Sequence, residues 1–210
     1  LRGARKAERD GSSIIHSAGA RYSNLTVYKG ALYFVAEING LADDDVIGLW
    51  KSDGTEAGTT KVKSGLGVNT SITTSVLAGD YFYFRADSET ASQGLWRSDG
   101  TEDGTVLIDG TNTLMGAPPP NRWAAAAGNR LVYRSYDPVS AVWSIDGSTQ
   151  GPAELFRFAD KGDVHLTTSQ DHVFFAGSEG DAELYVTDGT IEGTALVADL
   201  NPGAPNSLPA

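Results

Sequence analysis

One short motif occurs four times along the 210-residue chain: an aromatic residue, two spacers, Asp-Gly, and then Thr or Ser. The copies begin at Trp50, Trp96, Trp143 and Tyr185. Their aspartates, Asp53, Asp99, Asp146 and Asp188, are spaced by 46, 47 and 42 residues. A period of about 40–50 residues is typical of the blades of a β-propeller. The motif therefore predicts an array of equivalent units.

The sequence around each motif predicts β-strands. Runs rich in aromatic and β-branched residues precede the motif at 32–36, 81–86, 131–134 and 173–176, and such runs favour strands. Further short strands are expected before these runs, at 24–28, 71–77, 123–127 and 164–168, and after the Asp-Gly loops, at 59–63, 105–108, 154–158 and 194–199. With the strand that carries the aromatic residue, each unit has four strands. The predicted fold is all-β: a β-propeller built from four-stranded antiparallel blades.

We expect one propeller-like domain over residues 1–210, with full repeats at about 23–65, 70–109, 122–158 and 163–200. Residues 9–16 look like the Asp-Gly loop and fourth strand of a preceding unit, so residues 1–22 are predicted to be a partial repeat. Residues 201–207 read as a loop that leads to a following unit. Because the fourth repeat has its own fourth strand, the extra strand favours a segment of a larger propeller. A closed four-bladed ring is the alternative.

Composition excludes several kinds of site. The net charge is −11, and basic residues cluster only at the start of the chain, in Arg2, Arg5, Lys6 and Arg9. Nucleic acid is therefore not expected as a partner, because phosphate binding needs a concentrated positive surface. The absence of cysteine excludes disulfides, thiolate catalysis and cysteine-based zinc sites. No apolar run approaches the roughly 20 residues of a membrane-spanning helix.

The repeated motif has a structural explanation. Aspartate accepts hydrogen bonds from N–H groups just ahead of it, and glycine adopts the positive φ of a tight turn. We expect this role for Asp53-Gly54, Asp99-Gly100, Asp146-Gly147 and Asp188-Gly189. The preceding aromatic residues are expected to pack between blades. A ring of cation-binding carboxylates and exposed rings that stack on sugars are the functional alternatives.

The longer phrases around three copies resemble the ELWxxDGT repeat of bacterial secreted and surface proteins. These phrases are residues 48–59 (GLWKSDGTEAGT), 94–105 (GLWRSDGTEDGT) and 183–194 (ELYVTDGTIEGT). The third copy departs from the pattern, because Gly151-Pro152 replaces the second Gly-Thr pair, which leaves the geometry of its loop open. The resemblance implies a propeller-like extracellular repeat, supplies no catalytic residues, and covers about residues 9–203.

Binding residues are expected in the loops that differ between units, because variable loops on a rigid scaffold commonly carry specificity. In a four-stranded antiparallel blade, these loops lie at the end opposite the Asp-Gly turns. The candidate binding residues are Asp43, Asp44, Asp45, Asp87, Glu89, Tyr136, Asp137 and Asp181. The three consecutive aspartates suit a solvated turn, with calcium coordination as the alternative. No other metal or cofactor is expected.

Catalytic patterns are sparse. The histidines at 16, 165 and 172 are isolated, and no metalloprotease or serine-hydrolase motif occurs. We therefore expect a non-enzymatic binding or structural module that recognises a protein or glycan, at the bacterial cell surface or outside the cell, with the periplasm as the alternative. A glycoside hydrolase or lyase that uses paired carboxylates is the second hypothesis. A structural subunit assembled with further repeats or subunits is the third.

Overall fold

The computed structural model describes residues 20–38, 47–67, 75–89, 94–109, 123–135, 140–148, 150–158, 165–178 and 182–199. These ranges form four antiparallel sheets of four strands, each in sequence order. The prediction of an all-β fold built from four-stranded antiparallel, blade-like sheets is confirmed. Within the described residues, there is no helix long and apolar enough to cross a membrane.

The bounds of the strands are as follows. The first sheet contains β1 (Ala20–Tyr28), β2 (Ala31–Ile38), β3 (Gly48–Ser52) and β4 (Thr60–Ser64). The second contains β5 (Val76–Ala78), β6 (Tyr81–Ala86), β7 (Gly94–Ser98) and β8 (Val106–Asp109). The third contains β9 (Ala124–Ala127), β10 (Arg130–Ser135), β11 (Ala141–Ile145) and β12 (Ala153–Arg157). The fourth contains β13 (Thr167–Ser169), β14 (His172–Ser178), β15 (Ala182–Thr187) and β16 (Ala195–Ala198).

Some predicted boundaries are wrong by a few residues. Strand β1 begins at Ala20, inside the range 1–22 that was expected to belong to a preceding repeat. Strand β13 begins at Thr167 instead of at 164; Leu166, just before it, is buried but unpaired with the sheet. Strand β5 is Val76–Ala78, so it begins one residue after the start of the described part (75–77) of its predicted run and ends one residue beyond it. Strand ends depend on packing against neighbouring sheets, which local sequence does not encode.

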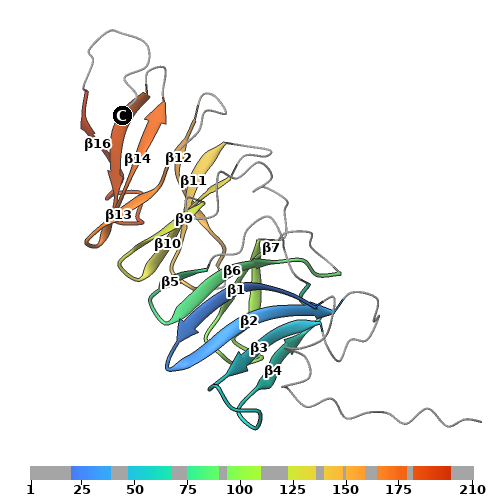
Figure 1. The fold of residues 1–210 in the computed structure, drawn as a ribbon. Helices are drawn as coiled ribbons and strands as arrows, with labels where there is room; N and C mark the ends of the chain where they lie inside the picture. The colour runs from blue at the N-terminus through green and yellow to red at the C-terminus, as the bar shows by residue number, and fades with distance from the viewer. Residues whose placement is uncertain are drawn as a thin grey trace, which may run out of the picture.

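The four sheets stand in an open row in sequence order (Figure 1). The first and fourth sheets lie at opposite ends of this row, so the described sheets do not close into a four-bladed ring on themselves. The first strands of neighbouring sheets meet along the row, since β9 contacts both β5 and β13. Strand β9 consists of four alanines, a poor strand sequence by propensity. Its small side chains form a strand because they pack between neighbouring sheets.

Each sheet has two faces with different neighbours. We call the face that packs on the following sheet the forward face; in the first sheet it consists of Tyr33, Val35, Leu49 and Val62. The face that packs on the preceding sheet is the rear face; in the second sheet it consists of Phe82, Phe84, Ala86 and Trp96. These two sets form a single buried cluster. The same arrangement joins the second sheet to the third and the third to the fourth, so the core consists of successive layers between sheets.

Candidate functional site

The antiparallel order places the connections of every sheet at two opposite ends. The connections between first and second strands lie at the same end as the Asp-Gly loops between third and fourth strands; we call this the turn end. The second strand of each sheet ends, and the third strand begins, at the opposite end, which we call the loop end. The repeated motif therefore lies at the end opposite to the described strand ends that flank the variable segments.

Each repeated aspartate closes its own turn. The Asp53 carboxylate accepts a hydrogen bond from the backbone N–H of Thr55 at 2.9 Å and another from its hydroxyl at 2.7 Å. The second and fourth repeats contain the same pair of bonds. The glycine after each aspartate has a φ between 83° and 93°, in the left-handed region. This is the geometry of an Asx turn followed by a residue that glycine suits best.

These hydrogen bonds lower the pKa of all four turn carboxyls. The threonine hydroxyl two residues ahead is the main cause for Asp53 and Asp188. For Asp146 it is the backbone N–H of Ser148. Burial raises the pKa of Asp99, but the hydrogen bonds from its threonine outweigh this effect and the pKa is lowered. The four side chains are therefore ionised hydrogen-bond acceptors at neutral pH.

The second half of the motif is also used within the loop. A Cβ atom on Gly58 would overlap the Asp53 carboxylate, so this position admits only glycine without rearrangement. The Thr59 hydroxyl donates to the Thr55 carbonyl oxygen at 2.6 Å and bonds the Ser52 hydroxyl at 2.8 Å. The second and fourth repeats have the same contacts. The hydrogen bonds that recur in these three copies of the motif thus stabilise the loop itself.

The third repeat keeps the first half of this arrangement and changes the second. The Asp146 carboxylate still accepts from the N–H of Ser148 at 2.9 Å. An apolar pair, Ile145 and Pro152, replaces the two hydroxyl-bearing residues of the other repeats. Gly151 has a φ of 86°, whereas the equivalent glycines of the other repeats are outside the left-handed region. Replacing both hydroxyl groups together avoids leaving one of them buried without its partner.

Asp-Gly turns also contact the preceding sheet. A Cβ atom on Gly100 would lie 2.5 Å from the hydroxyl oxygen of Tyr33, and one on Gly147 would overlap the ring of Tyr81. In the first sheet, no atom of the described residues lies within 4 Å of the equivalent position on Gly54. Glycine at these turns therefore serves both the backbone conformation and the close approach between sheets.

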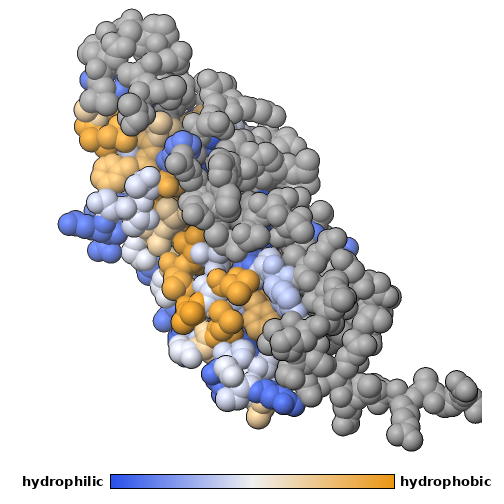
Figure 2. Space-filling model, viewed as in Figure 1, coloured by the Kyte–Doolittle hydropathy of each residue, from blue (hydrophilic) through white to orange (hydrophobic). Residues whose placement is uncertain are grey.

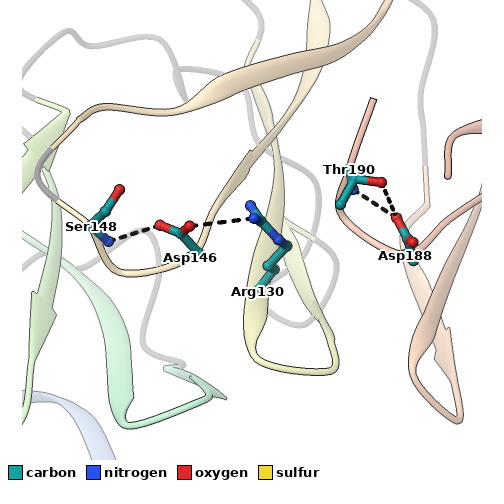
Figure 3. Close-up of polar contacts among 5 residues, drawn as sticks. All are labelled: Arg130, Asp146, Ser148, Asp188 and Thr190. Carbon is teal, nitrogen blue, oxygen red and sulfur yellow. Dashed lines mark hydrogen bonds and ion pairs between the residues drawn. The ribbon is translucent and has the colours of Figure 1, made fainter. Parts of the chain in front are cut away.

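Arg130 links the turns of the third and fourth sheets (Figure 3). Its guanidinium forms an ion pair with Asp146 of its own sheet, with Nη2 and Oδ2 3.3 Å apart. Its alkyl chain lies against the next turn, because a Cβ atom on Gly189 would lie 2.8 Å from the Arg130 Cδ. This side chain occupies the same place at the start of a second strand as Tyr81 does one sheet earlier.

Three of the four motif aromatics lie at contacts between sheets. Trp96 is buried in the cluster shared by the first two sheets. Trp143 packs against the cluster of the second and third sheets, and Tyr185 against that of the third and fourth. The ring centroid of Tyr185 is 4.5 Å from that of Phe156 in the preceding sheet.

Trp50, at the start of the row, has a different environment. It packs with Phe34 and Ala36 on the rear face of its own sheet. Its side chain is only 8% exposed. A buried ring of this kind is not presented for stacking on a sugar.

At the loop end, two predicted binding residues follow β6. The backbone of Asp87 pairs with Gly67, with N–O distances of 2.8 and 3.2 Å. The Asp87 side chain is half-buried and Glu89 is exposed. Arg85 lies just before them and is 1% exposed; burial lowers its pKa to about 10, while the charges of Asp87 and Asp109 oppose the shift. The acidic residues therefore follow a well-anchored strand end.

Asn24 is a structural residue that the sequence analysis did not single out. It has a φ of 56° and lies in the irregular stretch of β1 between Ser23 and Thr26. Its amide donates to the carbonyl oxygen of Arg85 in the second sheet at 2.8 Å and to the Ser23 hydroxyl at 3.0 Å. An asparagine inside a predicted strand was the available signal, because asparagine is depleted in strands and tolerates positive φ.

A shallow hollow of about 460 Å³ opens at the turn end of the first sheet. It is lined by Lys29, Ala31, Tyr33, Lys51, Ser52, Asp53, Gly58 and Thr60. The two lysines and one aspartate give it a polar, mixed-charge lining. Its Asp53 carboxylate is already engaged by Thr55.

The other candidate binding residues lie outside the described residues: Asp43, Asp44, Asp45, Tyr136, Asp137 and Asp181. The predicted calcium alternative at the three consecutive aspartates lies there too. In the parts of the chain that the structure describes, no three His, Asp or Glu side chains are grouped to hold a metal ion.

Comparison with known proteins supports the fold alone. No family model matches the chain, and no curated protein matches it in sequence. Similar solved structures include puromycin hydrolase, with a TM-score of 0.53, 14% identity and coverage of 88% of this chain. A mutant of puromycin hydrolase complexed with PGG gives a TM-score of 0.52 at 14% identity over 85% of this chain. This chain spans less than a third of those proteins, 29–30% of their length. The resemblance to ELWxxDGT-repeat proteins rests on the motif itself.

Proposed function

We propose that the protein is a non-catalytic binding or structural module that presents its acidic loop end to a protein or glycan. The observation that carries this proposal is the use of the repeated motif. The carboxylates, hydroxyls and glycines of the turns are engaged within the loops and, in three repeats, against the preceding sheet. The part that recurs is scaffold, and specificity then belongs to the loops that differ between units.

The turn carboxylates are poorly suited to acid–base catalysis. A general acid or base works best when its pKa lies near the operating pH. Hydrogen bonds lower the pKa of Asp53, Asp99, Asp146 and Asp188 below the ordinary aspartate value instead. Their ionised form stabilises a turn, and protonation would weaken it. This supports a scaffold role for these four aspartates and disfavours them as the paired carboxylates of the glycosidase alternative.

The loop end of the second sheet offers acidic groups on a firm support. Pairing with Gly67 holds the backbone of Asp87, and the exposed Glu89 follows two residues later. Binding of a ligand to these groups costs little conformational entropy of the protein backbone that carries them, since that backbone is already ordered. Basic patches on proteins and hydroxyl-rich or amine-bearing glycans have the complementary chemistry.

The proposed location is the bacterial cell surface or the extracellular medium, with the periplasm as the alternative. The support is the resemblance of the repeats to those of secreted and surface proteins. An assembly with further repeats or subunits fits the same proposal, because a row of sheets presents many loops along one end.

The test is a screen of the full chain against glycan and protein arrays, followed by affinity measurements on retained partners. The loop-end variant combines Asp87→Asn with Glu89→Gln. The matched control combines Glu102→Gln with Asp103→Asn, two exposed acids at the turn end of the same sheet. We expect at least tenfold weaker binding for the loop-end variant and unchanged binding for the control, with equal melting temperatures confirming intact folds.

Two results would overturn the proposal. One is measurable turnover of glycoside substrates by the full chain, lost on replacing a pair of carboxylates. The other is retention of no partner on either kind of array. A calcium requirement is tested separately: a chelator that leaves both binding and melting temperature unchanged removes calcium from consideration.

A further inference from the structure

The forward face of the fourth sheet is apolar and partly open to solvent. Within β14, Val173 and Phe175 point toward the third sheet. Alternation along the strand therefore turns Phe174 and Ala176 to the opposite side. Their partners in β15 are Val186 and Leu184. None of these four side chains is fully buried.

Three of these four positions are buried in each earlier sheet; the exception is the position of Val186, where Lys51 of the first sheet is only partly buried. In the first sheet the register equivalents of Phe174 and Leu184 are Tyr33 and Leu49, 7% and 1% exposed. In the third sheet they are Val132 and Val142, both 0% exposed. Burial comes in each case from the rear face of the following sheet.

In every sheet, a register shift between the third and fourth strands leaves one residue of the fourth strand without a register partner. This residue, too, is more buried in the earlier sheets than in the fourth. Val62 occupies this position in the first sheet and is 8% exposed within the shared cluster. Ile108 and Leu155 occupy it in the next two sheets and pack against the clusters shared with the following sheet. Val197 occupies it in the fourth sheet and is 46% exposed. Figure 2 shows apolar side chains exposed in the region of the fourth sheet.

At the turn end, too, residues that contact the following sheet in earlier repeats have an exposed equivalent in the fourth sheet. Tyr81 and Arg130, each the first residue of a second strand, lie against the turn glycine of the following sheet. His172 is the first residue of β14 and pairs with Ser169 in the same register. Its side chain is exposed. Both the strand face and the hairpin of the fourth sheet therefore have the features of a position that receives another sheet.

We propose that this forward face is the docking surface for a further blade of the same repeat. The occupant is a four-stranded sheet whose rear face presents an aromatic residue at the position of Trp96 and whose Asp-Gly turn lies over His172. The argument is continuity: three consecutive interfaces in this chain join a forward face to the rear face of such a blade. The apolar surface here is the part of the fourth sheet that those interfaces would bury.

The experiment extends the full chain after residue 210 with a duplicate of its own second repeat, residues 64–109. Hydrogen–deuterium exchange is then measured in β14 and β15. We expect at least tenfold slower exchange in these strands than in the unextended chain. Two substitutions in the extended chain should each abolish this slowing of exchange. One is Leu184→Glu in the original fourth sheet, and the other places Asp at the duplicated tryptophan that corresponds to Trp96. In the unextended chain Leu184→Glu should change the exchange of β14 less than twofold.

Three results would overturn the proposal. The first is slow exchange in the added repeat itself with no change of exchange in β14 and β15. The second is fast exchange throughout the added repeat, because docking on this face should order it. The third is dimerisation of the unextended chain that Leu184→Glu prevents, which would assign the face to a second copy instead.

Discussion

The hydroxyl oxygen of Tyr33 lies 2.5 Å from the position that a Cβ atom on Gly100 would occupy. Tyr33 belongs to the first sheet and Gly100 to the turn of the second. The aspartate and threonine of this turn bond to each other within the loop. The same turn is thus also a contact between sheets, and Lys63 of the first sheet donates to the Glu102 carbonyl oxygen of the loop at 3.4 Å. The glycine is required twice, once by its φ of 93° and once by the neighbouring side chain.

Gly100→Ala and Gly54→Ala separate these two requirements. Both glycines have a φ of 93°, but only Gly100 faces a side chain of another sheet. We expect Gly54→Ala to lower the free energy of unfolding by about 1–2 kcal/mol through backbone strain. Gly100→Ala should cost about 1–3 kcal/mol more, because overpacking is added. Denaturant titration measures both.

Tyr33→Phe serves as the control for the contact. Combined with Gly100→Ala, it removes the oxygen closest to the new methyl group and should recover part of the extra loss. Combined with Gly54→Ala, it should recover nothing. Equal costs for the two alanine variants would contradict the assignment of Gly100 to an inter-sheet contact.

The hydroxyl pair of Ser98 and Thr105 is expected to be strongly coupled. The two oxygens are 2.7 Å apart and both residues are completely buried. Thr105→Val leaves the serine hydroxyl without this partner and should cost about 1–3 kcal/mol. The double variant Ser98→Ala/Thr105→Val should lose less unfolding free energy than the sum of the losses of the two single variants. The third repeat supports this expectation, because it has the apolar pair Ile145 and Pro152 at these positions. A double-mutant cycle with a coupling below about 0.5 kcal/mol would contradict this expectation.

The turns should make the protein sensitive to acid. Hydrogen bonding lowers the folded pKa of all four turn aspartates, so their contribution to stability is complete above the unfolded value of about 4. It is lost as the pH falls through the lower folded pKa. Denaturant titration between about pH 2 and pH 6 should show this decline, and Asp188→Asn should make it shallower. An identical pH dependence in the variant would argue against the turn carboxylates as its source.

Asn24 should contribute to the contact between the first two sheets. Asn24→Gly keeps access to the φ of 56° but removes the hydrogen bond to the Arg85 carbonyl oxygen. We expect a loss of about 1–3 kcal/mol in unfolding free energy, because a buried acceptor loses its partner. Asn24→Ala should cost more than Asn24→Gly, since alanine adds backbone strain. Thermal unfolding of both variants provides the measurement.

The candidate site was only partly accessible to sequence reasoning. The Asp-Gly turns were predictable, because their hydrogen bonds join residues no more than a few positions apart. The role of Asn24 was not, since its partner Arg85 is 61 residues away. The contacts between the Asp-Gly turns and the preceding sheets were likewise not predictable. Nothing near Gly100 in the sequence indicates that Tyr33 lies against it.

The repeat, the four-stranded antiparallel unit and the hydrogen bonds of the Asp-Gly turns could be predicted from the amino-acid sequence, since periodicity, strand propensity and hydrogen bonding within ten residues are local properties. Which face of each sheet packs forward and which packs to the rear depends instead on how the sheets are arranged in space. This arrangement also explains why Val62 is buried whereas its equivalent Val197 is half exposed. The two valines have equivalent places in the repeat, and their difference arises from whether another sheet lies against them.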